Sequence, residues 1–230
     1  MFLTPGNDTL DALVNYLRIM LLGPPGSGKG TCAKFIGDLY GVPVITTGDM
    51  LRAAVANDTP LGKTAKGYMD RGELIPDDLV NILVTERLSE PDAAKGFIID
   101  GYPRSAKQAI ALDESLKKMG KSLDHVLHVN LEDDLIINRT INRRSCPKCG
   151  AIFNLLNKPP KIADKCDFCG EPLLQRDDDK EDVIINRLKV YHERTKPLLD
   201  WYKKKRKVKT IRGDIDLTEL PAALNRSLES

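Results

Sequence analysis

The stretch that decides the fold is Arg18-Ile-Met-Leu-Leu-Gly-Pro-Pro-Gly-Ser-Gly-Lys-Gly-Thr31, an apolar run that leads into a glycine-rich loop ending in lysine. Glycines allow consecutive backbone N–H groups to turn toward one point, and a helix that follows adds the positive end of its dipole. Lys29 adds a positive charge for the β- and γ-phosphates of a nucleotide. We therefore predict a strand, a phosphate-binding loop and a helix.

One detail distinguishes this loop from the general pattern. The general pattern has Ser or Thr directly after the lysine, where the hydroxyl holds Mg²⁺. Here Gly30 stands between Lys29 and Thr31. A glycine-rich turn that binds no ligand is the alternative, but strand, loop and helix patterns in the required order favour phosphate binding.

The rest of the chain alternates strand patterns with helix patterns. Short apolar runs predict further strands at 42–45, 96–99, 125–129 and 208–211. Apolar residues at three- and four-residue spacing predict helices over 29–40, 77–88, 105–118, 131–144, 178–203 and 216–228. The predicted fold class is α/β, a doubly wound, five-stranded parallel sheet in three layers.

Two segments do not follow this alternation. Residues 46–75 have a helical pattern without a following strand and with Gly62, Gly67 and Gly72 as interruptions, so we predict an inserted helical arm. Residues 142–179 contain few large apolar residues, and a module of that size needs a metal or disulfides to be stable.

Four of the five cysteines have the spacing of a metal site. They form two knuckles, Cys146-Pro-Lys-Cys149 and Cys166-Asp-Phe-Cys169, with residues 150–165 between them. This pattern predicts a structural zinc site, with iron as an alternative ion. Cys32 follows the phosphate loop on the predicted helix, where we expect it to pack in the interior.

Composition excludes few functions. The net charge is +2 with 30% charged residues, which is no excess of positive charge for nucleic acid, and no apolar run is long enough to span a membrane. The amino terminus lacks the pattern of a signal peptide, so we expect a cytoplasmic protein. The basic string 203–207 resembles a nuclear-import or nucleic-acid motif, but it also closes a predicted helix, where cations are favoured.

Asp100 is a candidate ligand for Mg²⁺ through water. It ends a buried strand pattern, and in a doubly wound sheet the carboxyl ends of the central strands lie beside the phosphate loop. A capping role for Asp100 in the next turn is the alternative.

Arginines are concentrated at the borders of the two inserted segments and beside sharp turns. They are Arg52, Arg104, Arg139, Arg143, Arg144, Arg176 and Arg187. Two phosphate chains brought end to end repel by about 1 kcal/mol per charge pair at 4 Å in water, and planar guanidinium groups offset this repulsion. The three histidines have packing or surface patterns, but a phosphate acceptor is already ionised and needs no general base.

With these motifs assembled, the chain from Arg18 to the carboxyl terminus resembles adenylate kinases of the long, metal-binding-lid type. The motifs are Gly23-Pro-Pro-Gly-Ser-Gly-Lys-Gly-Thr31, Thr47-Gly-Asp-Met-Leu-Arg52, Asp100-Gly-Tyr-Pro-Arg104, Arg143-Arg144, and Arg176-Asp-Asp-Asp179 before Arg187-Leu. The resemblance implies the reaction ATP + AMP ⇌ 2 ADP with Mg²⁺. It also implies a core at 18–45, 76–141 and 180–230, an AMP-binding arm at 46–75 and a lid at 142–179, while residues 1–17 form an extension without a counterpart.

The resemblance also implies roles for individual residues. The expected catalytic residues are Lys29, Arg104, Arg143, Arg176 and Arg187. The expected ATP-binding residues are Gly26, Ser27, Gly28, Lys29, Gly30, Thr31, Arg139, Arg143, Ile152, Phe153 and Ile215. The expected AMP-binding residues are Thr47, Arg52, Glu73, Leu74, Ile75, Gly101, Tyr102, Pro103, Arg104, Gln108, Arg176 and Arg187.

This chain departs mildly from the common family pattern. It has Tyr102 where Phe is common, Ser105 where Thr is common, and Glu181-Asp-Val where a Thr commonly precedes the Val. Gln108 and the cysteine lid favour AMP as acceptor; the alternative is another nucleoside monophosphate kinase, which acts on UMP or CMP or uses GTP as donor. The alternative from another class is a zinc-ribbon NTPase that binds nucleic acid. We expect a monomer without nucleic-acid or membrane partners.

Overall fold

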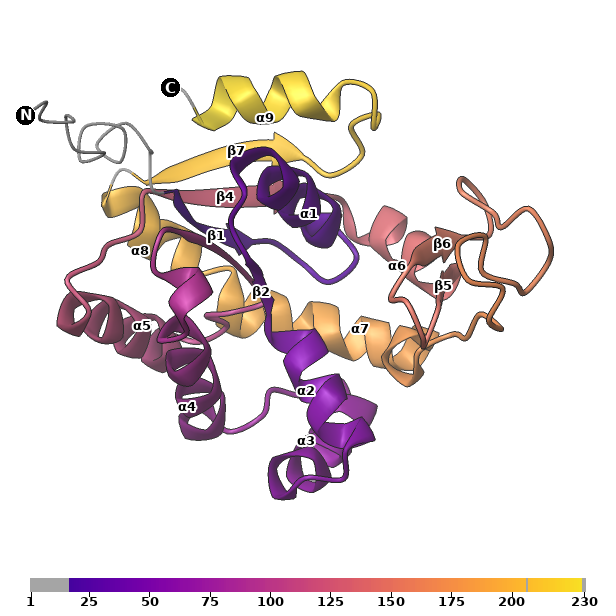
Figure 1. Ribbon diagram of the computed structural model, residues 1–230, viewed down its shortest axis with the longest axis horizontal. Helices are drawn as coiled ribbons and strands as arrows, with labels where there is room; N and C mark the ends of the chain where they lie inside the picture. Colours follow the sequence, from indigo (N-terminus) through magenta and orange to yellow (C-terminus); the bar gives the residue numbers. More distant parts are fainter. Residues whose placement is uncertain (1–16, 206, 229–230) are drawn as a thin grey trace, which may run out of the picture.

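The computed structural model describes residues 17–205 and 207–228, which fold around one parallel sheet (Figure 1). Its strands are β1 (Arg18–Leu22), β2 (Val44–Thr46), β3 (Phe97–Asp100), β4 (His125–Asn130) and β7 (Val208–Arg212), in the order β2-β3-β1-β4-β7. All neighbouring strands are parallel. The predicted five-stranded parallel sheet is confirmed. Because Leu21 of β1 pairs with Asp100 of β3, the phosphate loop after β1 begins beside that carboxylate.

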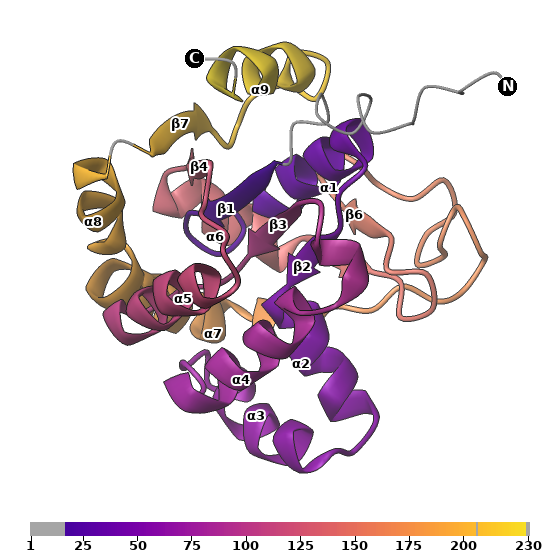
Figure 2. The same ribbon diagram turned by 60° about the vertical axis from the view of Figure 1, so that its left-hand side comes forward.

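Helices cover both faces of the sheet (Figure 2). The long elements are α1 (Lys29–Tyr40), α4 (Asp77–Leu88), α5 (Ala106–Lys118), α6 (Asp133–Ile141), α7 (Glu181–Val190), α8 (Leu198–Lys204) and α9 (Leu220–Leu228). Alternate residues of β1 enter different cores, because successive strand side chains point to opposite faces. Met20 packs with residues of α4, α5 and α8, whereas Ile19 packs with residues of α1 and α9. The predicted three layers are therefore present.

The segment after β2 forms two packed helices, α2 (Thr47–Ala56) and α3 (Pro60–Asp70), which lie below the body in Figure 1. The prediction that Gly62 and Gly67 interrupt the helical pattern is wrong, because both lie within α3. Gly62 is explained by close packing: a Cβ there would lie 2.1 Å from the carbonyl oxygen of Ala54 on α2. Gly72 does follow the helix, with a left-handed φ of +69°.

The cysteine segment contains only a small sheet, β5 (Arg143–Ser145) paired antiparallel with β6 (Ile152–Asn154). It projects to the right of the body in Figure 1. Its buried cluster consists of Cys146, Phe153, Cys166 and Leu173. Two of these four residues are metal-site cysteines, so the cluster is too small to stabilise the segment alone.

Several predicted element boundaries are wrong. The helix predicted over 131–144 ends at Ile141, because residues 143–145 pair with β6, a contact that local periodicity does not report. The helix predicted over 178–203 begins at Glu181, after a 3₁₀ turn (Asp177–Asp179). It is then divided by a π turn (Tyr191–Thr195) before Pro197, which has no N–H to donate.

Smaller differences concern strand ends and the last helix. The strands predicted at 42–45 and 96–99 lie at 44–46 and 97–100. The last helix begins at Leu220 and not at residue 216. A second 3₁₀ turn, Pro91–Ala93, precedes β3.

Three sequence-based predictions concern the remaining features. The extension 1–17 lies outside the described residues except for Leu17, and so does residue 206 of the basic string. Lys203 and Lys204 form the last turn of α8, as expected for cations that close a helix. Cys32 is buried, as predicted. In the described part of the chain, no helix is both long and apolar enough to cross a membrane.

Candidate active site

The loop between β1 and α1 is shaped by glycine. Gly26 and Gly28 adopt left-handed φ values of +75° and +100°. A Cβ on Gly26 would lie 2.4 Å from the Thr140 hydroxyl oxygen of α6, so the loop packs directly against that helix. The first turn of α1 closes through bonds from the N–H groups of Thr31 and Cys32 to the Gly28 carbonyl. The loop thus presents a helix amino terminus toward the space above it, as an anion site requires.

Lys29 lies within this loop. Its ammonium donates to the carbonyl oxygens of Gly23 at 2.9 Å and Pro24 at 2.6 Å. Removal from water lowers the pKa of Lys29 to about 8, and the nearby carboxylate of Asp100 partly opposes this shift. The side chain is therefore cationic at neutral pH. A bound phosphate would compete with the two carbonyl oxygens for the hydrogen bonds of its ammonium.

This lowered pKa predicts a pH-dependent affinity for nucleotide. Above pH 8 most Lys29 side chains in the free protein are neutral, and ATP binds the protonated form. Binding is then coupled to the uptake of a proton, so the Kd for ATP should rise by up to about tenfold per pH unit. Isothermal titration between pH 7 and 9.5 measures this, because the second ionisation of phosphate, with a pKa of about 6, is largely complete throughout that range. Lys29→Arg keeps its charge throughout and should lose the dependence. An equally steep dependence in Lys29→Arg would contradict the assignment.

Asp100 lies at the carboxyl end of β3 and is only 8% exposed. Its Oδ2 is 3.8 Å from the position that a Cβ on Gly30 would occupy, which places the carboxylate beside the first turn of α1. Burial raises the pKa of Asp100, and the positive charges of Lys29 and Arg104 oppose the rise. A carboxylate next to a phosphate loop is suited to bind Mg²⁺ through the water molecules of the hydrated ion.

Two arginines at the lid border are held by acidic partners. The Arg143 Nε atom lies 2.8 Å from Asp179 Oδ2, and its Nη2 atom contacts the other oxygen, so the pair is bidentate. Asp179 is fully buried. Arg187 Nη1 lies 2.9 Å from Asp178 Oδ2, and Arg52 Nη1 lies 3.9 Å from the same oxygen. Asp178 therefore connects the arm to α7.

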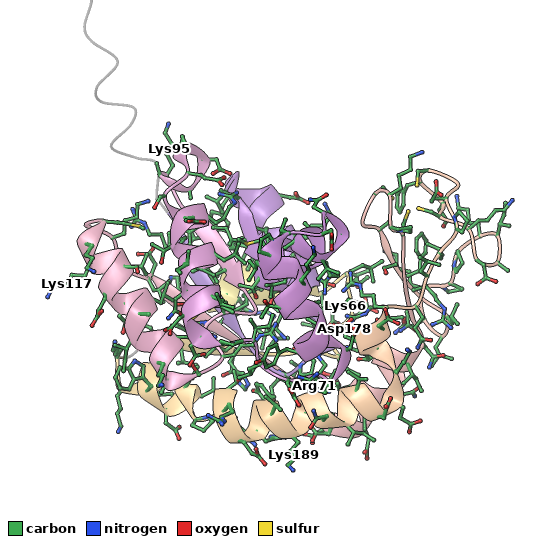
Figure 3. All side chains as sticks on the ribbon, turned by 90° about the horizontal axis from the view of Figure 1, so that it is seen from below. Lys66, Arg71, Lys95, Lys117, Asp178 and Lys189 are labelled. Carbon is green, nitrogen blue, oxygen red and sulfur yellow. The ribbon has the colours of Figure 1, made fainter. Side chains whose placement is uncertain are left out.

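Figure 3 shows the place of this connection. Asp178 lies beside the arm helix that carries Lys66, where the lid joins α7. Burial raises the pKa of Asp178, but Arg187, Arg52 and other guanidinium groups together lower it. Asp178 and Asp179 stand in the sequence only as part of a motif, and no role was predicted for either. From the sequence alone, three aspartates before a helix are equally typical of solvent-exposed residues that cap the helix.

The acidic partners balance the positive charge of the arginines only in part. Loss of hydration lowers the pKa of Arg176 and Arg187 to about 10; neighbouring guanidinium groups lower both pKa values further, and the carboxylates of Asp178 and Asp179 oppose the shifts. Both remain cationic at neutral pH. Such a group of partly dehydrated cations favours the binding of a multiply charged anion, because its oxygen atoms would replace the hydrogen bonds to water that the guanidinium groups have lost.

The loop after β3 forms the opposite wall. Thr47 is buried, and its hydroxyl donates to the Gly101 carbonyl at 2.9 Å. The Gln108 amide oxygen accepts from the Arg104 N–H at 2.7 Å, so its amide nitrogen is the group that remains to contact a ligand. Tyr102 is 2% exposed, and its hydroxyl lies 2.7 Å from Asn81 Oδ1 on α4. The hydroxyl that distinguishes Tyr102 from the common Phe therefore has a hydrogen-bond partner.

One cleft of about 1430 Å³ brings these groups together. Single-ligand sites are usually about 300–1,000 Å³, so this cleft has room for two nucleotides. It is lined by every predicted ATP-binding, AMP-binding and catalytic residue and by Asp100, and also by Asp49, Asp178, Tyr191 and Thr195, which the sequence analysis did not select. None of the three histidines, all within the described part of the chain, lines it.

The four lid cysteines form a separate centre. Their sulfur atoms all lie within 4.8 Å of one another, with Cys146–Cys169 at 3.4 Å and Cys149–Cys166 at 3.5 Å. Tetrahedral zinc with Zn–S bonds of about 2.3 Å requires sulfur atoms about 3.8 Å apart, so the geometry fits one ion. Of the four, only Cys149 lines the cleft.

A phosphate loop that faces a wall of arginines across a space for two nucleotides transfers a phosphoryl group to another phosphate, and the chain is accordingly a P-loop nucleoside monophosphate kinase. The family model described as adenylate kinase matches residues 21–207. The chain belongs to the adenylate kinase family.

Curated relatives agree with this membership. The chain is 48% identical over 201 residues to an adenylate kinase of Thermosipho melanesiensis, and the aligned region covers 87% of this chain and 94% of the relative. It is 50% identical over 201 residues to an adenylate kinase of Archaeoglobus fulgidus, covering 87% and 93%. It is also 44% identical over 214 residues to one of Symbiobacterium thermophilum, covering 93% and 99%.

Proposed function

We propose that this protein catalyses the reversible, Mg²⁺-dependent reaction ATP + AMP ⇌ 2 ADP and so maintains the balance of adenine nucleotides. The observation that supports it most is the single cleft in which the phosphate loop, the arginines and the loop after β3 meet. The decisive experiment is a coupled assay of ATP with AMP, UMP, CMP and GMP as acceptors. Equal kcat/KM for all acceptors would contradict the proposal.

On the donor side, the loop Gly26–Thr31 and the Lys29 ammonium bind the ATP phosphates. Arg139 and Arg143 reach the donor from the lid border, and the chain at Ile152, Phe153 and Ile215 contacts the base. These residues line one side of the same cleft. Asp100 would hold a Mg²⁺ ion through water, and such an ion would offset part of the charge of the phosphates.

On the acceptor side, Thr47, Arg52 and the chain at Glu73, Leu74 and Ile75 surround AMP, together with Gly101, Tyr102, Pro103 and Gln108. Arg104, Arg176 and Arg187 bind the phosphates that meet between the two nucleotides. Their guanidinium groups stabilise the charge on the transferring group, which needs positioning and not a base. The assignment rests on their convergence on the cleft.

Acceptor choice should depend on Gln108. Its amide oxygen is engaged by Arg104, so its amide nitrogen is left to donate to a base acceptor. Gln108→Ala should reduce kcat/KM for AMP by about tenfold more than for UMP, because a buried group of the base loses its partner, whereas the lost restraint on Arg104 affects every acceptor alike. Gln175→Ala, at a glutamine outside the cleft, is the matched control. A uniform loss for all acceptors would show that Gln108 does not read the base.

UMP/CMP kinase activity, or GTP as donor, remains the enzymatic alternative that the same assay tests. We further propose that the lid metal is zinc and not iron, which elemental analysis of the purified protein decides. The monomeric state, the cytoplasmic location and the lack of nucleic-acid or membrane partners stay predictions from the sequence. The zinc-ribbon alternative would require retention on nucleic acid at physiological salt.

A further inference from the structure

A π turn interrupts the helix that leads from the lid back into the core. It spans Tyr191–Thr195, and the N–H of Lys196 donates to the Tyr191 carbonyl at 2.8 Å, five residues earlier. Such turns are rare and occur frequently at functional sites. The wider turn changes which side chains face the sheet. Thr195, at its end, is 6% exposed and lines the cleft.

The Thr195 hydroxyl bonds to a residue far away in the sequence. Its Oγ1 donates to the backbone carbonyl oxygen of Arg104 at 2.9 Å. Arg104 has two further restraints: its N–H donates to Gln108 Oε1 at 2.7 Å, and its Nε donates to the Gly101 carbonyl at 2.7 Å. Both of those partners belong to the same loop and helix start as Arg104. Among these three bonds, only that from Thr195 ties Arg104 to the α7–α8 segment.

The same segment carries Arg187, and the two guanidinium groups face one cleft. The positive charge of Arg104 lowers the pKa of Arg187, after the larger effect of dehydration, so the two cations are close enough to repel. Two repelling groups on different elements need a fixed separation if one anion is to meet both. The bond from the Thr195 hydroxyl to the Arg104 carbonyl ties the segment that carries Arg187 to the backbone of Arg104.

We propose that Thr195 is a positioning residue that sets Arg104 relative to Arg187 for binding the acceptor phosphate. The inference rests on the proposed function, because it assumes that these arginines bind that phosphate. Its hydroxyl proton is engaged by the Arg104 carbonyl, so Thr195 acts through the Arg104 backbone, and the π turn that it ends places the hydroxyl at that carbonyl.

The test is steady-state kinetics of Thr195→Val, which keeps the shape of the side chain and removes the hydroxyl. One neutral hydrogen bond corresponds to about 3- to 10-fold, so the KM for AMP should rise by that factor. The KM for ATP should change less than about twofold, because the phosphate loop keeps its own restraints. Thr195→Ser should restore the KM for AMP. If Thr195→Val fails to fold, Thr195→Ala supplies the same comparison.

A matched control separates positioning from stability. Thr85 of α4 also forms a hydroxyl contact between elements, at 3.3 Å from Ser115 Oγ of α5, but it does not line the cleft. Thr85→Val should lower Tm without moving either KM. An equal rise of both KM values in Thr195→Val, or no rescue by serine, would overturn the positioning role. Failure of the wild-type protein to phosphorylate AMP would instead contradict the proposed function.

Discussion

Lys29→Ala should lower kcat by about 10²–10³-fold or more while the protein stays folded. The ammonium is the positive charge at the start of α1, and among the described residues it donates to two loop carbonyls, for which a phosphate would compete. Without it, the charge that develops on the transferring group loses its stabilisation in a partly dry cleft. Stopped-assay kinetics at saturating ATP and AMP measure the loss.

Folding should not suffer from this change. Because the folded state lowers the pKa of Lys29 to about 8, the charged lysine costs folding free energy at neutral pH, and its removal should not lower Tm. Lys117→Ala removes the same charge from α5, where the side chain points away from the body (Figure 3), and should keep full activity. Near-normal kcat in Lys29→Ala would contradict the role given to the phosphate loop.

The parts of the fold that the sequence predicts well are those with a local cause. The phosphate loop needs glycine at positions 26 and 28 for positive φ values, and α1 begins at Lys29 as its pattern indicates. The spacing of the four lid cysteines also predicts that they lie close together, and in the structure their sulfur atoms do so.

Features that depend on distant partners were not predictable in the same way. The end of α6 is set by pairing of β5 with β6, although Ile137 and Ile141 continue a helical pattern. Asp179 reads as a solvated acid, and only the fold shows it fully buried against Arg143. Thr195 gives no signal beside its neighbours, because its partner Arg104 lies 91 residues away.

The site followed the same division. Motif residues such as Lys29 and Arg104 could be selected because they stand in recognisable strings, and the structure brings them to one cleft. The acids that pair with the arginines were missed because composition shows charges and not their partners. Knowing that Asp178 accepts from Arg187 changes the expectation for the ligand-free protein: its arginines are partly neutralised before any phosphate arrives.

Cys166→Ser should lower Tm and reduce the metal content well below one ion per chain, while activity at low temperature remains. Four thiolates complete a tetrahedral site and leave no position for water or substrate, so the ion has a structural role. Zinc binding in small peptides is worth about 10–16 kcal/mol, which rivals the total stability of a domain at about 5–15 kcal/mol. The lid cluster is built largely from its own metal-site cysteines and has little else to hold it.

The measurements are elemental analysis, thermal denaturation and kinetics on the same preparation. Cys32→Ser is the matched control, because Cys32 is a buried cysteine outside the metal centre and its loss should leave the metal content intact. Activity should persist in Cys166→Ser when the lid is still folded, since Lys29 and the cleft arginines are unchanged. If kcat is lost entirely at low temperature in a variant that circular dichroism shows to be folded, the ion acts in the chemistry itself and not through the stability of the lid.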